Sequence, residues 1–196
     1  MKKVLLLAMS FCMLNAGYSV YGGMAMTKAA NSEAMEGMTD EFTPSFTVGA
    51  SMDAGPVVVG AGFSQRVMAM KMDMDGIDWT SKGTHNYLEF WAAYPYAAGP
   101  VVLYGGMMLG MPMGDATMSV ELDGVELMSE TMSGEDANRA SLDYGLMFGA
   151  SYPFNDKMSL SAGYYLGLAD IADERMEGDD GSTKWNSLMV TAGYNF

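Results

Sequence analysis

Alternation of apolar and polar side chains dominates this sequence. The clearest example is the last stretch, W-N-S-L-M-V-T-A-G-Y-N-F, which runs from Trp185 to Phe196. A period of two residues is typical of a β-strand with one apolar face. The opposite face of this strand carries mostly small or polar side chains. The apolar face consists of Leu188, Val190, Ala192, Tyr194 and Phe196.

Seven earlier segments alternate in the same way, so the pattern predicts eight strands. The connections between these segments alternate between tight turns and long polar stretches. Turns are predicted at 53–56, 97–100 and 153–156, where Gly, Pro, Asn and Asp gather. The predicted strands are 18–27, 43–52, 57–70, 84–96, 101–113, 139–152, 158–168 and 185–196.

Acidic residues are concentrated in the long connections. Twenty of the 24 Asp and Glu residues lie in segments 28–41, 71–82, 115–138 and 170–184. Within the predicted strands only Glu89 and Asp143 are acidic, and both lie on a polar face. A soluble sheet would scatter charges over its solvent face, whereas a charge that faces lipid is costly. The distribution therefore predicts an all-β fold, an eight-stranded antiparallel up-and-down transmembrane β-barrel.

The N-terminal residues have the pattern of a secretory signal. Lys2 and Lys3 precede an apolar run from Val4 to Leu14, and the small Ala16 follows. The run is too short to span a bilayer, which takes about 20 apolar residues. We expect a cleaved signal peptide over residues 1–16 and one barrel domain over 17–196. Cys12, the one cysteine, lies inside the signal, so we expect no disulfide.

Two local features refine the barrel. Within 115–138, the sequence M-S-V-E-L-D-G-V-E-L-M-S predicts a hairpin that turns at Asp123-Gly124. In the last strand, we expect Trp185 near the outer membrane interface and Phe196 at the periplasmic rim.

These features resemble the small eight-stranded outer-membrane β-barrel family of Gram-negative bacteria, which has an OmpA-like membrane domain. The resemblance rests on the signal, the eight alternating segments, the rhythm of turns and connections, and the terminal Tyr194-Asn195-Phe196. It implies export through the periplasm into the outer membrane and contact with lipid and lipopolysaccharide as a monomer. It also implies an assembly signal, read by the barrel-assembly machinery, at Leu188, Val190, Ala192, Tyr194 and Phe196.

Four charged residues are predicted inside the barrel. An eight-stranded barrel is just wide enough for side chains to fill it, so interior charges should pair across the lumen. We expect a structural plug, with a gated polar path as the alternative. The four residues are Arg66, Glu89, Arg139 and Asp143.

Methionine is unusually abundant, with 23 residues. Met68, Met70 and Met72 share the predicted interior face, and His85 begins the next predicted strand on its own interior face. Thioethers and an imidazole suit Cu(I), a soft ion, which makes these four residues a candidate metal site. The alternative is that methionine is a flexible apolar filler throughout this chain.

The sequence predicts an integral outer-membrane protein with a structural or surface-interaction role, acidic extracellular loops and a side-chain-filled lumen. A narrow channel for small solutes is the main alternative, and a soluble β-sandwich binder is a third. With His85 as the one histidine, an acid–base triad has a single candidate base, and we expect neither enzymatic activity nor a cofactor. A net charge of -14 disfavours nucleic acid as a partner because phosphates would be repelled.

Overall fold

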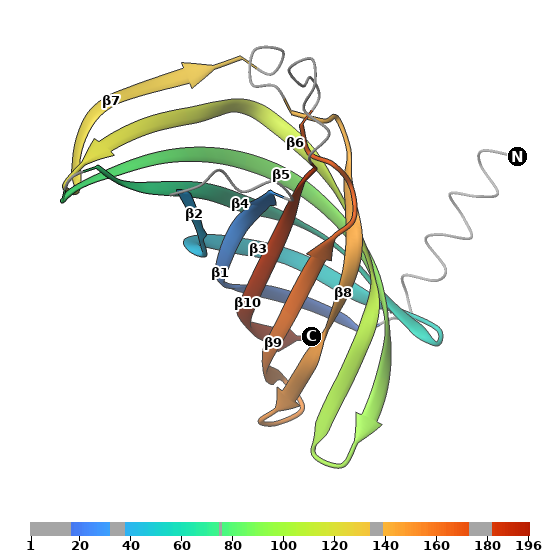
Figure 1. Ribbon diagram of the computed structural model, residues 1–196. Coiled ribbons are helices and arrows are strands. Elements are labelled where there is room, and N and C mark those ends of the chain that lie inside the picture. Colours follow the sequence, from blue (N-terminus) through green and yellow to red (C-terminus); the bar gives the residue numbers. More distant parts are fainter. Residues whose placement is uncertain (1–16, 32–37, 75, 134–138, 173–181) are drawn as a thin grey trace, which may run out of the picture.

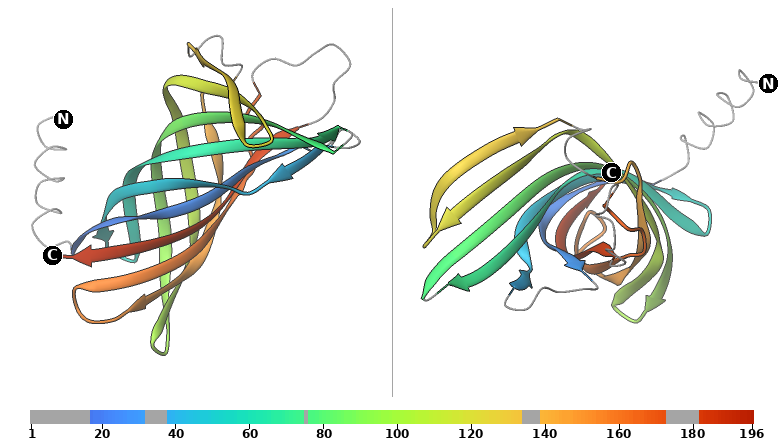
Figure 2. Two further views of the ribbon diagram at one scale, coloured as in Figure 1. Left: turned by 90° about the vertical axis from the view of Figure 1, so that its left-hand side faces the viewer. Right: turned by 45° about the horizontal axis from the view of Figure 1, so that its top comes forward.

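The computed structural model describes residues 17–31, 38–74, 76–133, 139–172 and 182–196. All regular secondary structure in these ranges is β-strand. The strands form one antiparallel sheet that closes into a barrel and extends beyond it on one side (Figures 1 and 2). Within the described ranges, no helix is long and apolar enough to cross a membrane. The predicted signal peptide, residues 1–16, lies outside the described residues and stays a prediction.

Eight strands form the barrel wall, and each is antiparallel to both of its neighbours. The ring closes where the first strand meets the last, since Ser19 pairs with Asn195 and Asn31 pairs with Thr183. The prediction of an eight-stranded up-and-down barrel is confirmed. The wall strands are β1 (Tyr18–Asn31), β3 (Thr43–Ala54), β4 (Val57–Met74), β5 (Ile77–Ala98), β6 (Val101–Leu122), β8 (Asp143–Pro153), β9 (Met158–Gly167) and β10 (Thr183–Asn195).

Side chains alternate between the two sides of the wall as the sequence predicts. On β10, Leu188 and Val190 are 45% and 53% exposed on the outside, whereas Ser187 is 4% exposed on the inside. On β8, Phe148 is exposed and its neighbour Met147 is buried. The outside of the barrel is therefore a continuous apolar band, which is stable against lipid acyl chains rather than against water.

The three short turns at one end of the barrel lie where the sequence predicts them. Gly55 and Gly99 link β3 to β4 and β5 to β6 with φ angles of 72° and 66°, a region that glycine enters without steric cost. Between β8 and β9, the Asn155 side-chain oxygen accepts hydrogen bonds from the backbone N–H groups of Lys157 and Met158, both at 2.9 Å. This end is called the short-turn rim below.

At the opposite end, the prediction of a connection over 71–82 is wrong. β4 and β5 continue as a ladder out to the pair Met74 and Ile77, and the chain reverses around Gly76, whose φ is 84°. The charged side chains that suggested a loop are compatible with strand because this part of the ladder lies beyond the lipid-facing wall. Lys82, for example, pairs with Glu121 of β6 at 2.6 Å.

The predicted hairpin within 115–138 is confirmed. β6 continues to Leu122, and β7 (Val125–Met132) returns beside it. Asp123 and Gly124 between them both have positive φ angles, 46° and 77°, as a type I′ turn requires. Residues 134–138, at the end of this predicted connection, lie outside the described residues.

The long strands and two short ones build a sheet that leaves the barrel. Ring pairing of β4 with β3 ends at Ser64, and that of β6 with β8 ends at Gly110. Beyond these points β4, β5 and β6 pair only with one another, with β2 (Met38–Glu41) and with β7. We call the outer parts of these strands, residues 69–74, 77–82 and 114–122, together with β2 and β7, the projecting sheet. In Figure 1 it arches over the barrel toward the upper left.

Candidate functional site in the barrel lumen

Arg66 is the centre of a charged group in the lumen. It lies on the inward face of β4 and is 1% exposed. Its Nη2 donates a hydrogen bond to Glu89 Oε1 on β5 at 2.8 Å, and its Nη1 donates to Asp143 Oδ2 at the start of β8. Both carboxylates are buried. One guanidinium therefore holds two acidic groups from β5 and β8, which lie on either side of β6 in the wall; a buried charge requires such partners.

Hydroxyl groups add a second hydrogen bond to one oxygen of each carboxylate. Ser64 Oγ donates to Glu89 Oε1 at 2.6 Å, and the Tyr165 hydroxyl of β9 donates to Asp143 Oδ2 at 2.7 Å. Asp143 Oδ1 is buried without a hydrogen-bond partner among the described residues, so the desolvation of this carboxylate is only partly offset.

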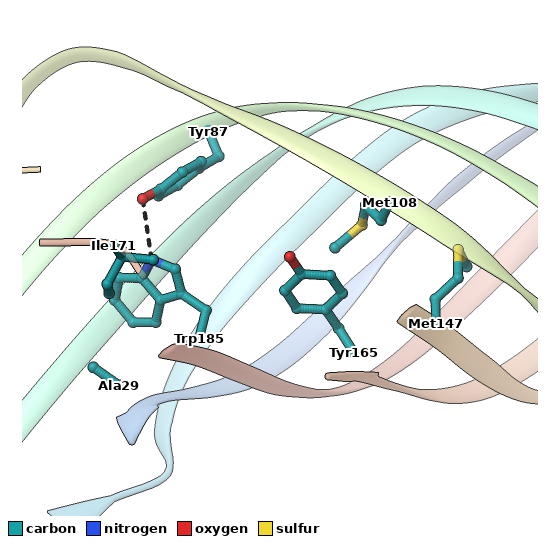
Figure 3. Close-up of a cluster of buried hydrophobic side chains, with 7 residues drawn as sticks. All are labelled: Ala29, Tyr87, Met108, Met147, Tyr165, Ile171 and Trp185. Carbon is teal, nitrogen blue, oxygen red and sulfur yellow. Dashed lines mark hydrogen bonds between the residues drawn. The ribbon is translucent and has the colours of Figure 1, made fainter. Parts of the chain in front are cut away.

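Aromatic rings surround the guanidinium of Arg66. The Arg66 Cζ atom lies 4.2 Å from the ring centroid of Tyr87 and 5.0 Å from that of Tyr165. The Trp185 indole of β10 is fully buried, and its Nε1 donates to the Tyr87 hydroxyl at 3.0 Å (Figure 3). We call the whole group the lumen cluster; it consists of Ser64, Arg66, Tyr87, Glu89, Asp143, Tyr165 and Trp185.

The predicted interior set is only partly brought together. Arg66, Glu89 and Asp143 meet, whereas Arg139 lies apart from them, because β8 begins at Asp143 and not at residue 139. Arg139 Nη2 donates instead to the backbone carbonyl oxygen of Gly114 on β6. The cluster therefore has one cation and two carboxylates rather than two of each.

Three aromatic members of the cluster were not singled out as site residues. Tyr87, Tyr165 and Trp185 all occupy inward positions in the alternation, which was the available signal. The expected height of Trp185, near the outer membrane interface, stays a prediction; its side chain packs in the lumen against Tyr87 and His85. The sequence alone does not show whether an aromatic residue at the start of a strand packs in the lumen or faces the membrane interface. These two positions differ only in the face of the strand that the residue occupies.

The lumen is filled at the level of the cluster but not throughout. Toward the short-turn rim it contains a cavity of about 380 Å³. Glu89, Met108 and Met147 line its inner end, while Asp53 and Asn195 lie at the rim. The expectation of a side-chain-filled lumen therefore holds around the lumen cluster, whereas the part of the lumen near the short-turn rim contains a cavity.

The methionines of the candidate metal site spread along one face of β4. Met68 packs against the buried side chains of the lumen. Met70 is 37% exposed, and Met72 lies further out on the projecting sheet, so these two thioethers leave the lumen. His85 is 4% exposed and faces inward, with its ring 5.9 Å from that of Trp185.

The predicted assembly strand displays its apolar face outward. Leu188, Val190, Ala192, Tyr194 and Phe196 are all exposed on the barrel surface. The rings of Tyr194 and Phe196 contact each other edge to face, with 5.2 Å between their centroids. The backbone N–H of Phe196 donates to the carbonyl oxygen of Tyr18 at 2.9 Å, which fixes the last residue to the first strand.

The barrel geometry agrees with a match to a known family. Residues 4–196 match the model of the outer membrane protein beta-barrel domain. The chain belongs to this family. The protein is therefore an integral membrane protein of the bacterial outer membrane, and its apolar band is embedded among outer-membrane lipids. A search of curated protein sequences finds no match to the chain.

Solved structures similar to this outer-membrane barrel show the same fold. Neisserial surface protein A is 18% identical with a TM-score of 0.53, and the match covers 93% of this chain and 99% of that one. Ail, the attachment invasion locus protein of Yersinia pestis, was solved with the heparin analogue sucrose octasulfate; it is 18% identical with a TM-score of 0.51, covering 92% and 99%. At this identity the likeness shows the fold alone.

Proposed function

We propose that this outer-membrane barrel has a structural or surface-interaction role, with a closed lumen and a projecting sheet that meets partners outside the cell. The lumen cluster is the observation that carries the proposal. Arg66 joins Glu89 and Asp143 in the lumen, and the rings of Tyr87 and Tyr165 pack around it. A solute could pass only by separating these groups, and breaking a buried ion pair costs roughly 3–5 kcal/mol.

The projecting sheet supports the surface-interaction part of the proposal. Among the described strands β7 pairs only with β6, so its second edge is available to another chain. Its side chains Val125, Leu127 and Met128 are about three-fifths exposed. An exposed edge with apolar side chains is typical of surfaces that bind an added strand.

The acidic charge of the projecting sheet indicates which kind of partner it would bind. Glu126 and Glu130 lie on β7, and the chain as a whole has a net charge of -14. We therefore propose cationic protein segments as partners. For lipopolysaccharide, which is anionic, we propose contact through divalent cations that bridge the two acidic surfaces.

Our proposal includes no catalytic role. His85 is the one histidine of the chain, and neither of its ring nitrogens has a hydrogen-bond partner among the described residues. A general base must lie within hydrogen-bond reach of the group whose proton it takes. His85 is therefore not arranged as the base of a nucleophilic hydroxyl.

A narrow channel for small solutes is the second candidate, and the cavity of about 380 Å³ is the observation that favours it. Single-channel recording in planar lipid bilayers separates the two. A closed barrel gives no discrete current steps in the wild type, while Arg66→Ala, which removes the centre of the lumen cluster, is expected to give small ones. Discrete steps in the wild type would replace the closed-barrel proposal with the channel.

We also propose that the outward face of β10 is the surface bound by the barrel-assembly machinery and that the protein inserts as a monomer. The support is geometric: the apolar side chains of β10 are exposed, and both neighbours of β10 in the ring, β1 and β9, belong to the same chain. A ring closed within one chain needs no second copy.

A further inference from the structure

Two methionine sulfur atoms converge on the inward side of β5. Gly83 pairs with Met68 of β4 on one side and with Met118 of β6 on the other. A Cβ atom at Gly83 would lie 3.0 Å from Met118 Sδ and 3.4 Å from Met68 Sδ. The missing side chain of Gly83 thus leaves the space that the two thioethers occupy.

His85 lies on the same face, one pleat away from Gly83. It is 4% exposed, and both Nδ1 and Nε2 are buried with no hydrogen-bond partner among the described residues. Buried imidazole nitrogens are normally hydrogen-bonded, so an imidazole with neither nitrogen used is unusual. A nitrogen lone pair in this position is available to a metal ion.

The backbone pairing around His85 is irregular. The ladder between β5 and β6 shifts register between Thr84 and Asn86, so His85 faces three residues, 114–116, instead of one. Gly114 in this bulge has a φ of 62°. Bulges re-aim side chains and are common beside functional sites.

We propose that Met68, Met118 and His85 form a binding site for a soft monovalent metal ion, Cu(I) or Ag(I). Two thioethers and one neutral imidazole are the donors that such ions prefer. The described residues contain no group of three or more His, Cys, Asp or Glu side chains that could hold a harder ion. The proposal does not depend on whether the lumen conducts or on what binds the edge of β7.

The structure changes the composition of the site that the sequence suggests. Alternation along β4 groups Met68 with Met70 and Met72, but it cannot detect that Met118 of β6 approaches the same point beside Gly83. Met70 pairs with Asp40 and Ser81 on the projecting sheet, one pleat beyond Gly83. Met70 and Met72 therefore lie on the same face outside the site.

Two positive groups lie near His85. The charge of Arg66, which pairs with His85 across the β4–β5 ladder, is offset by Glu89 and Asp143, so the group that opposes a bound cation is Arg139. Its guanidinium acts electrostatically on His85, and its Nη2 donates to the carbonyl oxygen of Gly114 in the bulge. A fixed positive charge lowers the affinity for any metal cation. We therefore expect Arg139→Gln to tighten Cu(I) binding several-fold.

The experiment is a titration of the folded barrel in detergent with Cu(I), kept reduced by ascorbate, in competition with a chromophoric Cu(I) chelator. We expect one equivalent to bind. Met68→Leu with Met118→Leu, which keeps volume but removes both sulfurs, should lower the affinity at least tenfold. The matched control is Met107→Leu with Met111→Leu, two exposed outward-facing methionines, which should change nothing. Ag(I), which needs no reductant, should give the same ranking.

Folding of every variant is checked by its heat-modifiable migration on gels. If the double variant does not fold, His85→Gln and Gly83→Ala test the same site, since the first removes the imidazole and the second places a methyl group against both sulfurs. Each should lower the affinity. Wild-type protein that binds no equivalent, or site variants that bind as tightly as the wild type, would overturn the proposal.

Discussion

At the scale of single residues, Arg66 has the largest expected effect on stability. Arg66→Ala leaves Glu89 and Asp143 buried without a cation, so we expect the free energy of unfolding to fall by roughly 3–5 kcal/mol. This free energy is measured by urea titration of the barrel in lipid vesicles. The folded fraction at each urea concentration is the fraction with heat-modifiable migration on gels. Arg139→Ala is the control and should cost clearly less, because the side chain of Arg139 is not part of the buried ion pairs.

A triple variant distinguishes charge pairing from packing. Arg66→Met with Glu89→Leu and Asp143→Leu replaces the whole ionic group by apolar side chains of similar volume. Such replacements are often neutral or stabilising, so we expect the triple variant to regain most of the stability lost in Arg66→Ala. If the triple variant were as unstable as Arg66→Ala, the stabilisation would come from specific geometry and not from paired charge.

At the scale of elements, the projecting sheet should be separable from the barrel. Ring pairing of β6 ends at Gly110, and β7 pairs with no wall strand except β6. Replacing residues 115–138 by a short Asn-Gly turn should therefore leave a folded barrel with heat-modifiable migration. Loss of folding in this variant would show that the sheet belongs to the folding unit. The same variant lacks Met118 and should also lose the proposed Cu(I) site.

The wall strands could be predicted because lipid imposes a strict two-residue alternation, as in Leu188 and Val190 against Ser187. Their extensions could not, since outside the lipid a strand carries charge as easily as a loop does: Lys82 of β5 and Glu121 of β6 form an ion pair. Of the lumen cluster, the sequence predicted Arg66, Glu89 and Asp143 as interior residues, but not the aromatic members as site residues. The convergence of Met68 and Met118 beside Gly83 depends on the register of three strands, which alternation alone does not give.

At the scale of the whole molecule, closure of the ring joins the two ends of the described chain. Phe196 is 77% exposed, and its ring contacts that of Tyr194. Phe196→Ala should therefore reduce the amount of barrel assembled in the outer membrane of cells, while refolding of the purified variant in detergent stays close to wild type. The two yields, compared side by side, are the measurement. Equal losses in both would assign Phe196 to folding stability and not to recognition.

The position of the lumen cluster also has an electrical consequence. The cavity below it forms a recess toward the short-turn rim, and its lining is partly polar, with Ser19, Ser51 and Ser159, so water can enter it. Water in such a recess stays at nearly the potential of the compartment it opens to. A Donnan potential across the outer membrane would then fall mainly across the thin septum around Arg66 rather than across the full bilayer. The ion pairs of this barrel would therefore experience a steeper field than charges on its outer wall.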